Sequence, residues 1–183
     1  MDTKVTVKDK VFKKMLSKEV IDARIAELAK QIDQDYEGKE LVVLCVLKGA
    51  MPFAADLIRK MHLRIRLDFI RLSSYGAGTE SSGKIQELVS TGQDLSGKHV
   101  LVVEDIVDSG LTLEYLRKDL SSRQVASAAI ATLLFKPGNF KGNLAPEYKG
   151  FEIANEFVVG FGMDYAEEAR QLDSIYQLDE AGI

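Results

Sequence analysis

Apolar residues along the chain fall into two alternating kinds of segment. In the first kind they are nearly continuous, as in Leu-Val-Val-Leu-Cys-Val-Leu at 41–47, which is typical of a strand buried on both faces of a parallel sheet. Residues 63–69 instead alternate apolar and polar side chains, which predicts a strand with one wet face near a sheet edge. The predicted strands are residues 41–47, 63–69, 99–107, 125–135 and 157–161, with a short strand around Val89.

In the second kind of segment, apolar residues recur every three or four positions. This spacing predicts helices over residues 17–36, 51–61 and 111–120, and Ser17 is suited to cap the first of them. Because strands and helices alternate, the sequence predicts an α/β fold with a parallel sheet, right-handed crossovers and flanking helices. We expect residues 1–183 to form a single domain, in which the first helix and the chain ends make a small hood outside the sheet.

Composition and charge exclude several classes of protein. The chain has 183 residues, of which 46% are hydrophobic, and its longest strictly apolar run has seven residues, far short of the roughly 20 that a membrane helix needs. The polar first ten residues do not resemble a signal peptide. The single cysteine, Cys45, lies inside an apolar run and is typical of a buried thiol in a reducing compartment. The net charge of −4 gives no general attraction to nucleic acid or acidic membranes, so we expect a cytoplasmic protein with neither as a partner.

The segment 102–112 contains the strongest chemical signal. An apolar strand ends in Glu104 and Asp105, Asp108 follows, and a Ser-Gly-Leu-Thr turn then opens a helix. Such a turn offers free backbone N–H groups and the positive end of a helix to a phosphate monoester. The two adjacent carboxylates could bind ribose hydroxyls directly or through hydrated Mg²⁺. The same residues also fit a solvated loop in which Asp108 or Ser109 caps the helix, and the spacing alone leaves both interpretations open.

This segment resembles the 5-phosphoribosyl 1-pyrophosphate (PRPP) signature of the type I phosphoribosyltransferases. Four further segments, in their order and spacing, resemble the hypoxanthine-guanine members of that family, and the match spans roughly residues 41–178. They are Leu-Lys-Gly at 47–49, Ser-Ser-Tyr-Gly at 73–76, Leu-Phe-Lys-Pro at 134–137 and Phe-Val-Val-Gly-Phe-Gly-Met-Asp-Tyr at 157–165. The resemblance implies Mg²⁺-dependent transfer of 5-phosphoribose from PRPP to N9 of hypoxanthine or guanine, which gives IMP or GMP and pyrophosphate in purine salvage.

For the nucleotide side of the reaction, the resemblance assigns roles to the residues of the PRPP signature. Asp108 would be the catalytic acid/base that faces purine N7. Glu104 and Asp105 would bind the ribose 2′- and 3′-hydroxyls, in part through Mg²⁺. The residues that would hold the 5′-phosphate are Ser109, Gly110, Leu111 and Thr112.

For the purine base, the resemblance points to the ends of two later strands. Lys136 would donate to purine O6, Phe157 would stack on the ring, and the main chain of Val158 would meet its Watson–Crick edge. Asp164, beside the base, would reach a second Mg²⁺ on the pyrophosphate. Each residue also has a plain structural interpretation: a solvated lysine, two strand-core residues, and the N-cap of a helix over 166–170.

For pyrophosphate, the resemblance implies a loop formed by Lys48 and Gly49, with a cis peptide bond before the lysine. Arg170 would grip the anion, although an i,i+3 pair with Glu167 also explains it. Residues 73–83 would form a flexible lid that keeps water from the reaction, and its residues Ser74 and Tyr75 would cover the pyrophosphate.

Two other functions for the same fold stay open. One is an RNA-binding regulator of pyrimidine genes, which the basic residues Arg59, Lys60, Arg64, Arg66 and Arg71 would serve. The other is a phosphoribosyltransferase for adenine, uracil or orotate, although a lysine donor would be mismatched to the 6-amino group of adenine. A Rossmann dehydrogenase is dismissed because no G-x-G-x-x-G opens a helix. As in relatives, we expect a homodimer or homotetramer.

Overall fold

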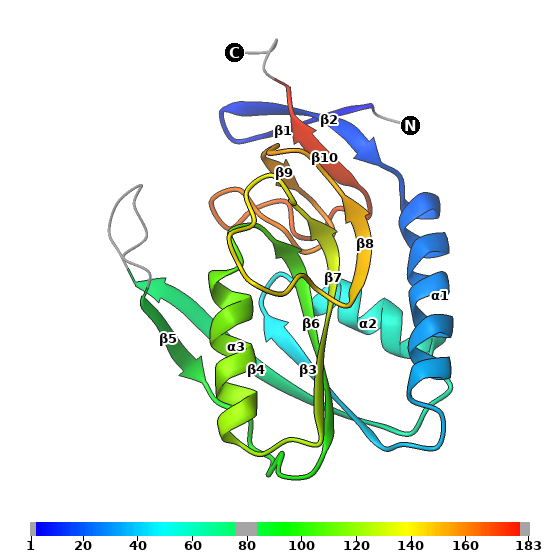
Figure 1. Cartoon of the computed structure of the whole chain (residues 1–183). Helices are drawn as coiled ribbons and strands as arrows, with labels where there is room; N and C mark the ends of the chain where they lie inside the picture. The colour runs from blue at the N-terminus through cyan, green and yellow to red at the C-terminus, as the bar shows by residue number, and fades with distance from the viewer. Residues whose placement is uncertain (1–2, 76–83, 180–183) are drawn as a thin grey trace.

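A six-stranded sheet forms the centre of the molecule in the computed structural model, which describes residues 3–75 and 84–179 (Figure 1). Its strand order is β5-β4-β3-β6-β7-β8, and every pairing is parallel except that of β5 with β4. The predicted α/β fold with a parallel sheet is therefore confirmed. The strands are β3 (Leu41–Leu47), β4 (Ile65–Tyr75), β5 (Lys84–Val89), β6 (His99–Val107), β7 (Ser127–Phe135) and β8 (Tyr148–Glu152).

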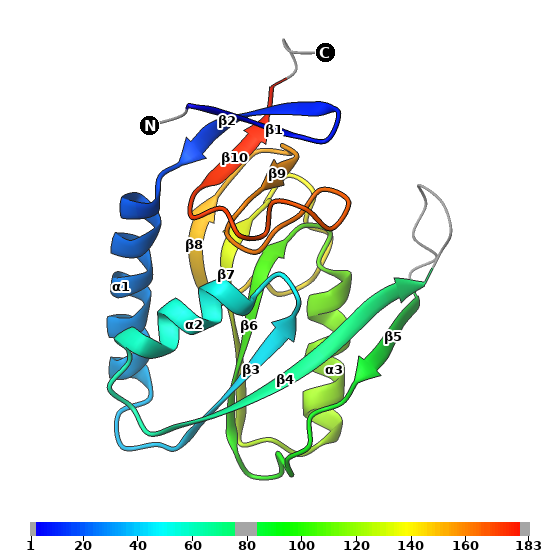
Figure 2. The same ribbon diagram turned by 180° about the vertical axis from the view of Figure 1, so that it is seen from behind.

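Helices cover both faces of this sheet, with α1 and α2 on one side and α3 on the other (Figures 1 and 2). The helices are α1 (Lys18–Asp35), α2 (Met51–Lys60) and α3 (Leu111–Ser122). The Ser17 hydroxyl accepts a hydrogen bond from the N–H of Val20, so the predicted cap is confirmed. The prediction that the first helix belongs to the hood is wrong. Its buried stripe packs with α2 against the sheet, because four isoleucine and leucine side chains on one face need that cover.

A second, antiparallel sheet lies above the carboxyl ends of the central strands and forms the predicted hood (Figure 1). Its order is β1-β2-β10-β9, with β1 (Lys4–Val7), β2 (Lys10–Leu16), β9 (Val158–Val159) and β10 (Ile175–Leu178). The strand predicted over 157–161 is reduced to two residues and pairs in this hood, because positive φ angles at Gly160, Phe161 and Gly162 turn the chain directly afterwards.

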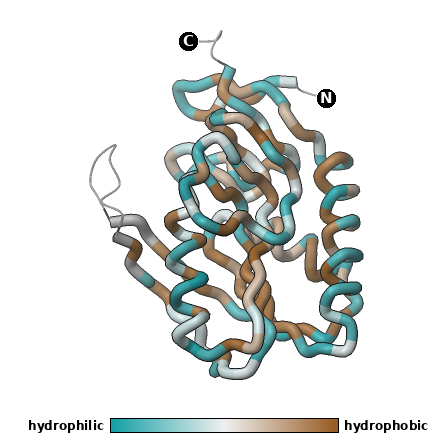
Figure 3. The backbone as a smooth tube through the Cα atoms, in the orientation of Figure 1, coloured by the Kyte–Doolittle hydropathy of each residue, from teal (hydrophilic) through white to brown (hydrophobic). Residues whose placement is uncertain are grey.

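The hydrophobic core follows the continuous apolar runs, which appear as brown strands at the centre of Figure 3. The alternation over residues 63–69 predicted that the apolar side chains face the core. In β4 this is wrong for Leu67 and Phe69, which are 39% and 38% exposed. Among the described residues, no helix is long and apolar enough to cross a membrane. Residues 76–83 of the expected lid lie outside the described residues, and Ser74 and Tyr75 are placed as backbone at the end of β4.

Because β3, β4, β6 and β7 are parallel, their carboxyl ends share the edge of the sheet that faces the hood. Lys48 follows β3, Asp108 follows β6 and Lys136 follows β7. The fold thus collects the chemistry-bearing residues of three separate segments at one edge.

Candidate active site

The turn between β6 and α3 is open at the helix end. Gly110 is the N-cap, with φ of +89°, and no side chain caps the helix there. A Cβ at Gly110 would overlap the ring of Phe140, so this position requires glycine for space as well as for conformation. The turn borders a cavity of about 110 Å³ that Ser109, Leu111 and Thr112 help to line. The Ser109 hydroxyl accepts from the N–H of Leu111 at 3.5 Å, and the other backbone N–H groups of the first turn stay available for an anion.

Asp108 does not cap the helix; its carboxylate turns instead to the end of β7. The backbone N–H of Lys136 donates to the carbonyl of Val107 at 2.9 Å, which places the two residues side by side. The Lys136 Nζ then donates to Asp108 Oδ2 at 3.2 Å. Only 9% of the lysine side chain is exposed, so the interpretation of a solvated lysine is wrong. A buried ammonium beside a carboxylate is a fixed donor–acceptor pair.

Sequence reasoning missed Asn139, which lies in the connection after β7. Its Nδ2 donates to Asp108 Oδ1 at 2.9 Å and to Asn155 Oδ1 at 2.7 Å. In the sequence, an asparagine two residues after Pro137 looks like any turn residue, so only the fold reveals the contact.

Asp108 and Lys136 share a pocket of about 260 Å³ with residues from the segment 157–164. The ring of Phe157 is 44% exposed and has hood residues beside it, with ring centroids of Phe12 and Tyr165 at 6.0 and 5.8 Å. A ring supported in this way while half-exposed at a pocket can stack on a planar ligand. The pocket is lined by Asp105, Ile106, Asp108, Lys136, Phe157, Val158, Met163 and Asp164.

The adjacent carboxylates Glu104 and Asp105 border different pockets. Asp105 borders the pocket of Phe157, whereas Glu104 borders the cavity at the turn between β6 and α3. Burial raises the pKa of Glu104 well above its usual range, and the charge of Asp105 adds to that rise. The Oε2 atom of Glu104 is buried without a hydrogen-bond partner among the described residues. An unpartnered buried carboxylate oxygen is costly unless a ligand or cation completes it.

The loop after β3 passes close to Asp105. A Cβ at Gly49 would overlap the Asp105 carboxylate, so this residue lets the loop approach the end of β6. The peptide bond between Leu47 and Lys48 is cis, as predicted. The Lys48 Nζ pairs with Glu167 Oε2 at 2.9 Å.

The segment 164–170 forms turns and not the helix that was the alternative explanation of Asp164. Ala166, Glu167 and Ala169 all have positive φ, which is incompatible with an α-helix. Asp164 Oδ2 accepts from the N–H of Glu167 at 2.8 Å, and its Oδ1 pairs with Arg170 Nη2 at 2.7 Å. Arg170 also has the predicted contact with Glu167, at 3.4 Å.

Comparison with known proteins agrees with this geometry. The family model described as "Phosphoribosyl transferase domain" matches residues 14–166. The chain is 45% identical to a hypoxanthine-guanine phosphoribosyltransferase of Mycobacterium bovis, over 90% of this chain and 85% of the relative. The corresponding protein of Streptococcus thermophilus is 42% identical, over 94% and 96%. A crystal structure of a hypoxanthine phosphoribosyltransferase from Staphylococcus aureus superposes with a TM-score of 0.88 at 41% identity, and covers 91% of each chain.

The chain belongs to the hypoxanthine-guanine phosphoribosyltransferase family. It is therefore a pentosyltransferase, and its role is purine salvage by phosphoribosyl transfer.

For a phosphoribosyltransferase, the carboxylates of this site fit a magnesium ion that binds together with substrate. Among the described residues, no group of three His, Cys, Asp or Glu side chains is arranged to hold a metal on its own. Asp105 and Asp164 nevertheless line one pocket, and burial raises the pKa of Asp105, with the charge of Asp164 adding to that rise. A hydrated Mg²⁺ that takes part of its oxygen ligands from a substrate would relieve this repulsion.

Proposed function

We propose that this phosphoribosyltransferase transfers 5-phosphoribose from PRPP to N9 of hypoxanthine or guanine, with Mg²⁺, and releases IMP or GMP and pyrophosphate. The observation that carries the proposal is the pairing of buried Lys136 with half-exposed Asp108, 3.2 Å between Nζ and Oδ2, in the pocket beside Phe157. The N7 and O6 atoms of a 6-oxopurine are neighbours on one edge of the base. An acceptor and a donor held side by side match that edge when N7 carries a proton.

In the proposed reaction, N9 attacks C1′ of the ribose as the bond from C1′ to the pyrophosphate oxygen breaks. Pyrophosphate leaves with the electron pair of that bond, and Asp108 takes the proton from N7 as the purine becomes a nucleoside base. Lys136 donates to O6, Phe157 stacks on the ring, and the buried main chain of Val158 meets the Watson–Crick edge.

PRPP is held at both of its ends in this proposal. The uncapped N-terminus of α3 with Ser109, Gly110, Leu111 and Thr112 binds the 5′-phosphate. Lys48, Gly49 and Arg170 bind the pyrophosphate, and Ser74 and Tyr75 would close over it as part of the lid.

Glu104, Asp105 and Asp164 are the residues that would hold magnesium, and the first two would also bind the ribose hydroxyls. When bound, Mg²⁺ supplies positive charge to the departing pyrophosphate oxygens. The unpartnered Oε2 of Glu104 and the shared pocket of Asp105 and Asp164 support these assignments.

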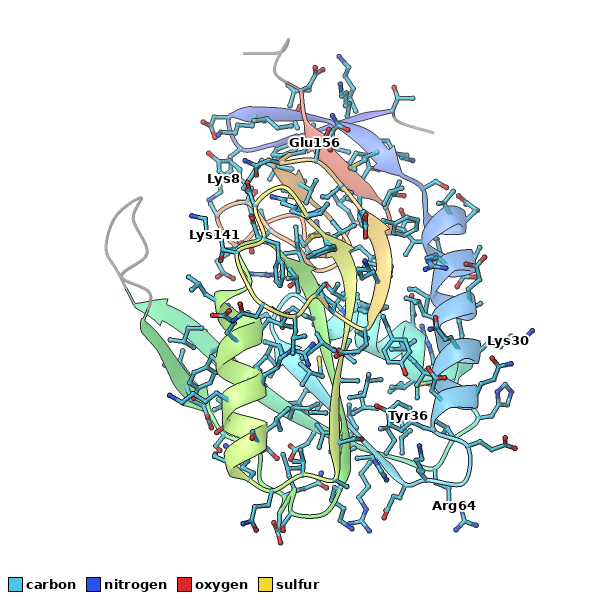
Figure 4. The ribbon with its side chains drawn as sticks, viewed as in Figure 1. Lys8, Lys30, Tyr36, Arg64, Lys141 and Glu156 are labelled. Carbon is cyan, nitrogen blue, oxygen red and sulfur yellow. The ribbon has the colours of Figure 1, made fainter. Side chains whose placement is uncertain are left out.

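An RNA-binding role receives less support from the described residues. Three members of the basic cluster are paired with the chain's own carboxylates: Arg59 with Asp56, Lys60 with Asp22 at 2.7 Å, and Arg66 with Glu40 at 2.6 Å. Arg64 lies at the opposite end of the molecule from the hood strands and from Glu156 (Figure 4). Charges that are already paired release fewer counterions from a nucleic acid.

The assembly and the location of the enzyme stay predictions. A homodimer or homotetramer is supported by Leu67 and Phe69, which expose apolar surface on β4. A cytoplasmic location follows only from the composition and the lone cysteine.

The test is PRPP consumption with Mg²⁺ over a panel of hypoxanthine, guanine, xanthine, adenine, uracil and no base. We expect turnover of 6-oxopurines only, abolished by EDTA. Asp108→Asn should lower kcat by about 10²- to 10⁴-fold because the proton acceptor is lost, while Asp173→Asn, an exposed carboxylate, should not. Turnover of adenine or uracil alone would overturn the proposal, and silence on every base would direct attention to RNA retention.

A further inference from the structure

Both amide hydrogens of Asn139 are used in the described structure. One is donated to Asp108 Oδ1 at 2.9 Å and the other to Asn155 Oδ1 at 2.7 Å. An asparagine amide has two donors, so this side chain has a single orientation that satisfies both acceptors at once. Lys136 donates to the other oxygen of Asp108, Oδ2, at 3.2 Å.

The two oxygens of Asp108 therefore differ. Oδ1 is occupied by an amide that has no place in the reaction, whereas Oδ2 faces the lysine that lines the purine pocket. If the carboxylate were free to rotate, either oxygen could meet the base, and much of its time would be spent misaligned. Fixing one oxygen presents the other to N7, and orientation of a reacting group is worth orders of magnitude in rate.

Asn155 gives this arrangement its anchor. It lies two residues before Phe157, in the segment that leads from β8 to the stacking ring, whereas Asn139 belongs to the connection after β7. The amide chain Asp108–Asn139–Asn155 thus joins the end of β6, the connection after β7 and the purine-stacking segment through side chains alone. Because Asn139 bonds both residues, a displacement of Asn155 would also move the carboxylate of Asp108.

We propose that Asn139 is a positioning residue that fixes the carboxylate of Asp108 for proton transfer, with Asn155 as its anchor. This inference rests on the proposed function, because it requires Asp108 to handle the N7 proton. A merely structural role for Asn139 is the competing explanation, since its backbone N–H also closes a turn onto the carbonyl of Lys136 at 3.2 Å. Substitution of the side chain leaves that backbone bond in place.

The experiment compares Asn139→Ala, Asn155→Ala and Asn155→Asp with Asn143→Ala, an exposed asparagine in the same connection. Steady-state kcat and KM for hypoxanthine and for PRPP are measured, together with thermal midpoints. We expect Asn139→Ala to lower kcat about tenfold with KM for PRPP within twofold. Asn155→Ala should lower kcat about threefold, and Asn155→Asp should restore it to within twofold because a carboxylate still accepts from Asn139.

A pH profile separates positioning from folding. Asn139→Asp places a second carboxylate beside Asp108 Oδ1, so the acidic limb of kcat should move to higher pH because like charges disfavour ionisation. The other charged groups of the pocket, Lys136, Asp105 and Asp164, are the same in every variant. A stability defect alone would lower the thermal midpoint and leave the acidic limb of the kcat profile at its wild-type pH.

The outcomes distinguish this inference from the proposed function. If wild type turns over 6-oxopurines and Asp108→Asn is impaired, but Asn139→Ala keeps kcat within twofold and Asn139→Asp keeps the wild-type pH profile, the positioning role is refuted and the proposed function stands. If Asp108→Asn itself retains full activity, the proposed function fails first. Loss of kcat in Asn139→Ala with an unchanged profile in Asn139→Asp would also overturn the positioning role.

Discussion

On the proposed purine side of the pocket, Lys136 and Asp108 form a pair in which 9% of the lysine side chain and 46% of the aspartate side chain are exposed. On the proposed pyrophosphate side, Lys48 pairs with Glu167, and those side chains are 47% and 67% exposed. The two pairs have similar N–O distances, 3.2 and 2.9 Å, so the distances do not distinguish them. The exposure of the two lysine side chains does distinguish the pairs.

This contrast in burial implies two ways of binding. Loss of Asp108 would leave the buried Lys136 ammonium in a medium that solvates it poorly, so we expect the Lys136–Asp108 pair to persist with or without ligand. An exposed pair is worth only about 0.2–1 kcal/mol, so an incoming polyanion can replace Glu167 on Lys48 at little cost. We therefore expect the proposed purine side to be preorganised, and the proposed pyrophosphate side to exchange an internal anion for a substrate anion.

The largest effect should follow from removing the buried lysine. Lys136→Ala removes both the proposed O6 donor and a partner of Asp108, and we expect kcat/KM for hypoxanthine to fall about 10²-fold or more. Lys141→Ala, an exposed lysine of the same connection, is the matched control. Steady-state rates with hypoxanthine and adenine check the result. Nearly unchanged purine turnover in Lys136→Ala would support an enzyme for another base.

Gly49 lies where the two sides meet, and changing it should have the next largest effect. A Cβ there would overlap the Asp105 carboxylate, so Gly49→Ala forces the loop after β3 away from the end of β6. We expect a loss of about 1–3 kcal/mol in the free energy of unfolding and a clear rise in KM for PRPP. Gly92→Ala is the control, because a Cβ at Gly92 has no atom within 4 Å. Equal behaviour of the two variants in denaturant and PRPP titrations would contradict this account.

The same contrast explains which parts of the molecule could be predicted from sequence. The bounds of β3 and β6 were predicted to the residue. A continuous apolar run with polar ends marks β3 as a strand buried on both faces, and apolar residues on both sides of Glu104 and Asp105 mark β6. The hood strands β1, β2 and β10 were not identified individually. β1 and β10 have only four residues each, β2 carries three lysines, and β10 pairs with a strand far away in the chain.

Within the site, residues that follow apolar strands could be named from the sequence, and loop residues could not. Lys136 was found because it follows β7 and matches a family segment, and the structure buries it. The hydrogen bond from Asn139 to Asp108 and the ion pair of Lys48 with Glu167 were not predicted. Asn139 and Glu167 each lie in a turn whose path depends on tertiary contacts. For residues 166–170 the sequence also allowed a helix, but the structure has turns there. Positive φ angles at alanine and glutamate cannot be predicted from the residue type.

A smaller effect is expected from removing the carboxylate that pairs with Lys48. Glu167→Gln removes the internal anion from Lys48, so pyrophosphate should bind about two- to fivefold more tightly, most clearly at low salt. The hydrogen bond from Lys48 holds the pKa of Glu167 below its usual value, so the competing charge is present at every working pH. Glu168→Gln is the control, since Glu168 meets Lys8 only at 3.8 Å. Weaker pyrophosphate binding in the reverse reaction would mean that Glu167 supports the substrate and does not compete with it.

The smallest effect concerns Cys45 in β3, the strand that leads to Lys48. Cys45 in β3 is fully buried, and burial raises the pKa of its thiol to about 12, with Glu104 and Asp105 contributing. A thiolate is the reactive form, so iodoacetamide at pH 8 should leave the native enzyme unlabelled and add one group per chain in denaturant, where the pKa is about 8.5. Pyrophosphate should change nothing, because the exchange of anions at Lys48 leaves β3 in place. Labelling of the native enzyme that accelerates with pyrophosphate would show that the strand moves with the loop, and the division into a fixed and an exchanging side would fail.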